Sequence, residues 1–208
     1  VAYAPKSSGP WASPRGALET ALHSGQIRVV DARTFVELAS WKAFDHECMQ
    51  VHVASEHGAI LTMGCDDDTN VSTVRVWRLD STAANAWQAV LCACVMVDAH
   101  ITCAAVPSHL SDVALGLSDG RVYVLHALSD SMHAKEPHII KPKLAREASF
   151  VDESTEPDVV TGLVIDASTL LISTVSCTLK CTLHGPRAGQ APSVFDTSGG
   201  PPRCGAAF

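Results

Sequence analysis

An acidic loop is the first stretch of the chain whose residue types could do chemistry. Asp66-x-Asp68-x-Asn70 has the spacing of the first half of a calcium-binding loop. However, Val71 stands where such a loop needs glycine, and Trp77 stands where it needs a bidentate glutamate. An acidic turn between two strands explains the same residues, so we predict no calcium site there.

The ten histidines show no spacing typical of a metal site or a catalytic triad. No two of them stand four residues apart with a glutamate between them, and no Gly-x-Ser-x-Gly elbow occurs. Gly116-x-x-x-Gly120 lacks the lysine of a phosphate loop and precedes an expected strand, whereas a nucleotide site needs a helix N-terminus. We therefore interpret the histidines as surface or core residues and predict no catalytic or cofactor-binding residue.

The eight cysteines are too few for a disulfide scaffold of 208 residues. The spacings Cys92-x-Cys94 and Cys177-x-x-x-Cys181 lack a second matching pair for zinc. Several cysteines fall within expected strands, so we predict small reduced core residues and no metal site.

Composition excludes several classes of protein. A net charge of −7 with 15 scattered basic residues disfavours a nucleic-acid binder, because phosphate binding needs clustered Lys and Arg. No apolar run approaches the roughly 20 residues that span a bilayer. Pro5, Pro10 and Pro14 interrupt any secretory signal at the start, so we expect a cytoplasmic protein.

A strand-like segment recurs along the chain and indicates its architecture. Val74–Asp80 alternates like a strand and carries Trp77 and Asp80 in a loosened form of the dipeptide typical of WD repeats. Equivalent segments contain Ile27 and Val122, at spacings of 47 and 48 residues, slightly above the ~40–45 residues of a WD repeat. A fainter fourth segment contains Leu179, 57 residues further on.

These repeats predict an all-β, WD40-like β-propeller that is incomplete, with about four blades of a larger propeller. Residues 1–22, rich in Pro, Ser and Ala, are expected to form a loosely ordered lead-in, and residues 23–208 the partial propeller. The run Ala89–Val97 has neither a polar face nor a charge, so we expect a strand buried on both sides.

Three polar segments are expected to be exposed loops. The longest is the connection from Ser129 to Pro157, with a short edge strand near Ile139-Ile140. The other two are Asp66–Asn70 and Ser81–Asn85. Because propeller loops converge on broad rims, we predict that these three segments contact protein partners.

The order of several segments resembles the N-terminal propeller of the vacuolar protein sorting-associated protein 11 family. The resemblance runs from about Ser24 to Cys204. The segments that carry it are Ser24–Ile27, Gly64–Asp68 leading to Val74–Leu79, Val113–Val122, Val159–Leu163 and Pro202–Cys204.

This resemblance implies a core subunit of the HOPS and CORVET tethering complexes, which hold endosomal and vacuolar or lysosomal membranes together before fusion. Its partners would be the other class C vacuolar protein sorting subunits, and it would lie peripherally on late endosome and vacuole membranes through the complex. Family members continue into an α-solenoid and a RING domain, which these residues do not contain. No small-molecule substrate and no nucleic acid is implied.

Two other functions stay open at the level of sequence. An unrelated WD40-type adaptor, such as a substrate receptor of a ubiquitin ligase, would use the same repeats to bind different proteins. A hydrolase or metalloenzyme built on a propeller would need His, Asp or Glu side chains that converge in space. We favour the non-catalytic scaffold, because no catalytic motif accompanies the repeats.

Overall fold

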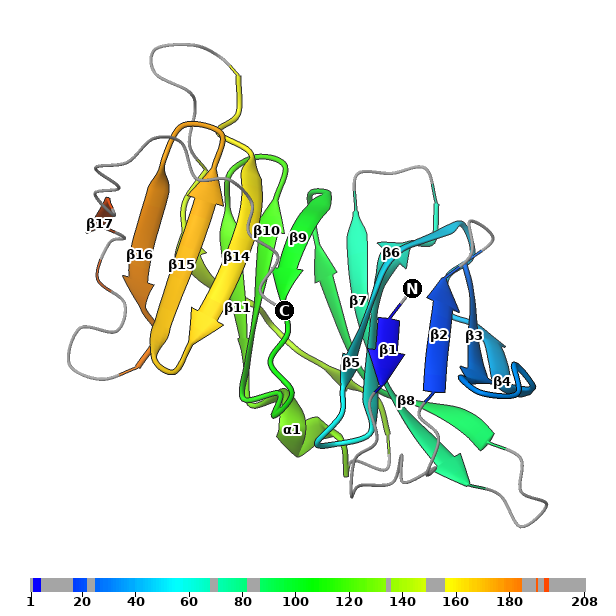
Figure 1. Ribbon diagram of the computed structural model, residues 1–208. Helices are drawn as coiled ribbons and strands as arrows, with labels where there is room; N and C mark the ends of the chain where they lie inside the picture. The colour runs from blue at the N-terminus through cyan, green and yellow to red at the C-terminus, as the bar shows by residue number, and fades with distance from the viewer. Residues whose placement is uncertain are drawn as a thin grey trace. The chain divides into compact units, whose positions relative to one another are not determined.

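The computed structural model describes residues 2–4, 17–21, 25–67, 71–81, 87–133, 136–148, 156–184, 190 and 193–194. These residues form four β-sheets, three with four strands and one with five (Figure 1). The sheets divide between two compact units. No helix among the described residues is long and apolar enough to cross a membrane.

The first and second sheets belong to one unit, which also contains a short helix, α1 (Leu128–Ser131). The first sheet is built from β1 (Ala2–Ala4), β2 (Ala17–Ala21), β3 (Gln26–Asp31) and β4 (Glu37–Lys42) in that order. Two of its strands lie within residues 1–22, the segment for which we expected a loosely ordered lead-in. These two strands are short and rich in alanine, so their alternation of apolar and polar residues is too weak to be detected in the sequence. The boundary at residue 23 stays a prediction.

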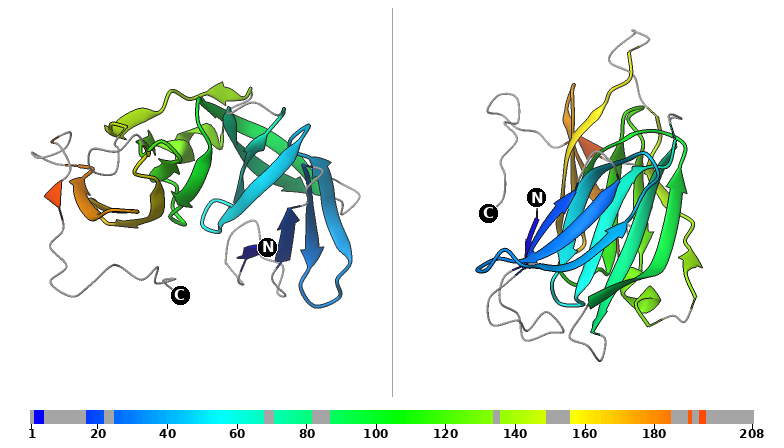
Figure 2. Two further views of the ribbon diagram at one scale, coloured as in Figure 1. Left: turned by 90° about the horizontal axis from the view of Figure 1, so that it is seen from above. Right: turned by 90° about the vertical axis from the view of Figure 1, so that its right-hand side faces the viewer.

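The second sheet is longer and twisted (Figure 2). Its antiparallel strands are β5 (Glu47–Ala54), β6 (Ala59–Cys65), β7 (Ser72–Ser81) and β8 (Trp87–Val97). A two-residue strand, β12 (His138–Ile139), pairs in parallel with β8, as predicted for the Ile139 region. Every residue of β6 is buried, which makes this strand the centre of the unit's core.

Trp77 links the strand repeat to this core. Its indole nitrogen donates a 2.9 Å hydrogen bond to the Thr62 hydroxyl, and its ring lies 5.7 Å from that of Trp41. The surrounding core is apolar and includes Ile27, Phe44 and the residues packed around them. A buried Trp whose N–H finds a partner contributes a large apolar area without an unsatisfied polar atom.

The third and fourth sheets belong to the other unit. The third contains β9 (Ile101–Ala105), β10 (Asp112–Leu117), β11 (Val122–His126) and β13 (Lys143–Arg146). The fourth contains β14 (Val160–Asp166), β15 (Thr169–Thr174), β16 (Thr178–Thr182) and β17 (Ser193–Val194). Strand β14 packs against β9 and β10, so these two sheets share one core.

The four segments predicted to be equivalent occupy the same place in each sheet. Ile27, Val74, Val122 and Leu179 all lie on the third strand, namely β3, β7, β11 and β16. The prediction of four blades is confirmed. The fourth strand of the third blade, β13, was missed, because it lies inside the polar connection from Ser129 to Pro157.

The prediction for Ala89–Val97 is wrong in one respect. The segment forms β8, but only some of its residues are buried, and Met96 is 65% exposed. The strand lies outside β7 in its sheet, and β12 pairs with only two residues of its other edge. The apolar residues of Ala89–Val97 therefore occupy an outer strand with several half-buried positions, and the strand is not buried on both faces.

Two buried charges bind the polar connection of the second unit to its sheets. Arg146, on β13, donates a 2.8 Å hydrogen bond to the Asp158 carboxylate and a 2.6 Å bond to the Gly120 carbonyl. Asp158 also accepts from the backbone N–H of Ser176. Because both side chains are almost fully buried, removing either one would leave the other as an unpaired buried charge, which is strongly destabilising.

Replacing Asp158 by Asn is expected to destabilise the protein by about 3–5 kcal/mol at pH 7, because a buried Arg146 charge loses its partner. Burial works to raise the pKa of Asp158, but the hydrogen bonds from Arg146 and Ser176 outweigh it and lower the pKa. The carboxylate therefore stabilises the fold above pH ~4, and this contribution is lost as the pH falls through the lowered pKa. Urea unfolding at several pH values measures both effects.

The matched control is Glu37→Gln, which removes a half-exposed ion pair with Arg28. It should change the free energy of unfolding by less than about 1 kcal/mol. The difference in the free energy of unfolding between wild type and Asp158→Asn should become smaller below pH ~4. A constant difference across the acid range would contradict the assigned pKa direction.

Gly116→Ala is expected to destabilise the second unit by about 1–3 kcal/mol through overpacking. A Cβ at Gly116 would lie 2.5 Å from Val160 Cγ1 and 2.7 Å from Cys103 Sγ. Gly162→Ala is the control, since a Cβ there would come no closer than 3.8 Å to Ser173. Unfolding midpoints measure both, and the double variant Gly116→Ala, Val160→Ala should lose less stability than the sum of the two single variants, because truncating the buried Val160 removes the clash. Equal midpoints for the two alanine variants would show that the close approach is not required.

Candidate functional site

Three side chains far apart in the sequence meet in the second unit. Asp112 begins β10 and His126 ends β11, and the antiparallel register places these two residues opposite each other. His184 follows β16 by two residues, next to the buried Leu183, whose backbone N–H donates to the Ser168 carbonyl. Asp112, His126 and His184 are called the Asp–His–His cluster below.

One carboxylate joins the two imidazoles of the cluster. Asp112 Oδ1 lies 2.5 Å from His126 Nδ1, and Asp112 Oδ2 lies 2.6 Å from His184 Nε2. The side chain of Asp112 is only 5% exposed, whereas those of His126 and His184 are 35% and 54% exposed. The cluster therefore has a fixed, buried acidic group and two imidazoles that reach solvent.

The electrostatics of the cluster keep Asp112 negatively charged at neutral pH. Burial works to raise the pKa of Asp112, but the hydrogen bonds and charges of His184 and His126 outweigh it, so the pKa lies below its usual value. Two nitrogens and a carboxylate oxygen within 4.8 Å of one another form a donor set able to hold a metal ion.

Sequence analysis missed this cluster. Asp112 and His126 are 14 residues apart, and His184 is 72 residues from Asp112. No metal-binding motif has these spacings, and only the register of β10 with β11 brings the first two together. The one signal in the sequence was the strand pair itself, since a hairpin places the start of one strand opposite the end of the next.

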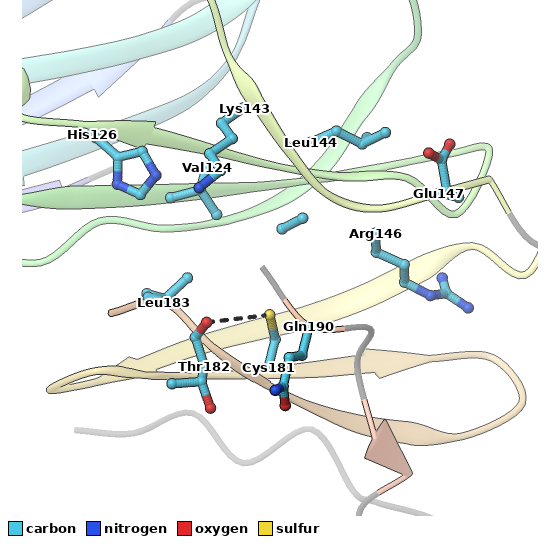
Figure 3. A pocket seen from close by; sticks show the side chains of 11 residues that line it. Val124, His126, Lys143, Leu144, Arg146, Glu147, Cys181, Thr182, Leu183 and Gln190 are labelled. Atoms are coloured by element: carbon cyan, nitrogen blue, oxygen red, sulfur yellow. Dashed lines mark hydrogen bonds between the residues drawn. The ribbon is translucent and has the colours of Figure 1, made fainter. Parts of the chain in front are cut away.

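A pocket of about 300 Å³ lies beside His126 (Figure 3). Val124 and His126 enter it from β11, Lys143–Arg146 from β13, and Cys181–Leu183 from the end of β16. Arg146 is held by Asp158, so its charge is already compensated. The lining combines apolar residues such as Val124 and Leu183 with charged ones such as Lys143, as in many sites that bind small molecules.

Cys181 is not an activated nucleophile, although it lines the pocket. Its thiol donates a weak hydrogen bond to the Thr182 carbonyl at 3.9 Å, and burial raises the pKa of Cys181 (Figure 3). A thiol must ionise to attack, so burial suppresses its reactivity. The seven cysteines among the described residues are all free thiols, and Cys204 lies outside that part of the chain.

The other sequence candidates have structural partners. Asp66 accepts a 2.5 Å hydrogen bond from Arg75 Nη2, and Arg75 packs over the ring of Phe44. His57 Nε2 lies 2.9 Å from the His109 carbonyl oxygen. The rest of the acidic loop, residues 68–70, and residues 82–85 of the second predicted contact loop lie outside the described residues.

A family model described as PEP5/VPS11 N-terminal matches residues 4–207 of the chain. No curated protein sequence matches it closely. The last segment of the sequence resemblance, Pro202–Cys204, falls within the matched range but outside the residues that the structure describes.

Two solved propellers are similar in fold. The C-terminal WD40 domain of Sif2 superposes with a TM-score of 0.57 at 14% identity, covering 81% of this chain and 43% of that one. The β-propeller domain of Myceliophteria thermophila Cps50 (Swd1) gives a TM-score of 0.55 at 14% identity, covering 79% of this chain and 48% of that one. The chain therefore spans less than half the length of these propellers. At such identity the likeness establishes the fold alone, an incomplete WD40-type propeller.

In the folded protein we expect Cys48 to resist alkylation at pH 8 and Cys94 to react. Burial raises the pKa of Cys48 to about 12, so almost no reactive thiolate is present, whereas Cys94 is partly exposed. Iodoacetamide treatment followed by peptide mass spectrometry measures the two rates. In denaturant both should react, and rapid alkylation of Cys48 in the folded state would contradict its burial.

Proposed function

The chain belongs to the PEP5/VPS11 N-terminal family, and from this membership we propose that it acts as a non-catalytic scaffold in a membrane-tethering complex of the HOPS/CORVET type. Its direct partners would be other class C vacuolar protein sorting subunits. It would lie in the cytoplasm, peripheral on late endosome and vacuole or lysosome membranes through that complex. The observation that carries the proposal is the family match over residues 4–207.

The chemistry of the described residues supports binding over catalysis. Burial raises the pKa of Cys48, Cys65, Cys92 and Cys181, so none of these thiols is activated. The two short hydrogen bonds of the Asp–His–His cluster join a carboxylate to two imidazoles, and neither of these bonds involves a serine or cysteine nucleophile. A propeller of this kind offers broad loop surfaces, which suit contacts with several proteins.

The turn between β3 and β4 is our candidate for one such contact. Asp31 Oδ1 accepts the backbone N–H groups of Arg33 and Thr34 at 2.9 and 2.8 Å, which fixes the turn. Phe35 follows at a φ of 55°, and its side chain is 70% exposed. A bulky residue at positive φ is strained, and leaving an aromatic side chain in water is unfavourable. Burying the ring against another subunit of the complex would offset both costs.

Affinity purification of the intact protein from cells, followed by mass spectrometry, tests the proposal. We expect wild type to recover class C tethering subunits. Phe35→Asn should reduce this recovery, because it removes the aromatic contact while asparagine tolerates the left-handed backbone. Val175→Ser is the control, since Val175 is a similarly exposed apolar residue of the other unit.

The outcomes separate the function from the contact. Recovery of cullin adaptors without tethering subunits would contradict the scaffold function and favour a substrate receptor of a ubiquitin ligase. Recovery of tethering subunits by wild type and Phe35→Asn alike would leave the scaffold in place and contradict the role of the turn.

A further inference from the structure

We propose that the Asp–His–His cluster is a binding site for a divalent transition-metal ion of the zinc type. The three ligand atoms would be Asp112 Oδ, His126 Nδ1 and His184 Nε2, which lie within 4.8 Å of one another. Two imidazole nitrogens and one carboxylate oxygen suit Zn²⁺ and Co²⁺, whereas Ca²⁺ and Mg²⁺ prefer sets made of oxygen. This proposal does not depend on the scaffold function.

The distances need only a small adjustment to admit an ion. Zinc binds nitrogen and oxygen at about 2.0–2.2 Å, so two ligands of a tetrahedral site are about 3.4 Å apart. The nitrogens of His126 and His184 now lie 2.5 and 2.6 Å from the Asp112 oxygens. Each imidazole therefore has to move about 1 Å away from the Asp112 oxygen that it now bonds, while the three ligand atoms, which lie within 4.8 Å of one another, close around the ion.

The exposure of the three side chains shows which groups make that movement. Asp112 is buried at the start of β10 and stays fixed by its place in the sheet. His126 and His184 are both partly exposed, and their rings are 5.8 Å apart at a tilt of 54°. The imidazoles can rotate outward around an entering ion while the carboxylate anchors it.

Charge also favours a cation at this place. Asp112 is an anion with little solvent around it, and each imidazole can bind an ion through the nitrogen that faces Asp112 while its other ring nitrogen carries the proton. Three protein ligands leave a fourth position for water, as in zinc sites that are not closed. His126 also lines the 300 Å³ pocket, so a bound ion would lie close to a space that can receive a small ligand.

Titration of the full chain, stripped with a chelator and kept reduced, with Co²⁺ and Zn²⁺ tests the site. We expect one equivalent to bind, with a visible Co²⁺ spectrum typical of nitrogen and oxygen ligands and without a thiolate charge-transfer band. His184→Ala should weaken binding at least about tenfold, since even outer-shell partners of metal ligands contribute 10–100-fold. Ca²⁺ should not compete.

His184→Ala is the decisive variant, because this side chain is more than half exposed and its loss should leave the fold intact. His126→Ala and Asp112→Asn should weaken binding as well. The control is the double variant His100→Ala, His138→Ala, which removes two exposed histidines elsewhere. Far-UV circular dichroism verifies that each variant is folded.

The proposal is overturned by either of two results. One is the absence of saturable Co²⁺ or Zn²⁺ binding to the folded wild type, which would make the cluster a hydrogen-bonded tie between two blades. The other is binding of equal strength in wild type and His184→Ala, or binding with a thiolate band, which would assign the ion to cysteines or to other histidines.

Discussion

The close approach of β14 to β9 and β10 is the constraint on which the second unit depends. Gly116 has no side chain, and the space that a Cβ would fill is taken by Val160 and Cys103. The Thr102 hydroxyl lies 2.6 Å from the Val160 carbonyl and 3.1 Å from the Gly116 carbonyl, so it donates to the backbone of both sheets. Gly116 and Val160 thus take part both in the apolar packing between the two sheets and in the hydrogen bonds that join them.

This packing also determines where the polar groups of the unit meet. Asp112 lies at the start of the strand that contains Gly116, whereas His184 comes from the fourth sheet. A shift between the two sheets would separate the carboxylate from its second imidazole and leave a buried charge half satisfied. The Arg146–Asp158 pair similarly joins the third blade to the chain that enters the fourth. The buried charged groups therefore favour the one arrangement of the third and fourth sheets in which their hydrogen bonds are complete.

Sequence alone predicted the repeat but not the contacts between repeats. Val74 and Val122 lie on equivalent third strands because alternation within one strand is a local property that the sequence shows directly. β13 was missed because its residues are mostly exposed and polar, so only pairing with β11 makes them a strand. The Asp–His–His cluster was missed because it depends on how two sheets pack, which no local spacing encodes.

The two functional proposals are physically independent. Phe35 belongs to one compact unit, in a turn that a hydrogen bond to Asp31 holds. The positive φ of Phe35 is strained, and because its ring is mostly exposed, little burial among the described residues offsets that strain. The Asp–His–His cluster belongs to the other unit, where the same carboxylate serves two imidazoles. Strain and exposure at Phe35 favour a macromolecular surface, whereas a buried anion with two imidazole nitrogens favours a small cation.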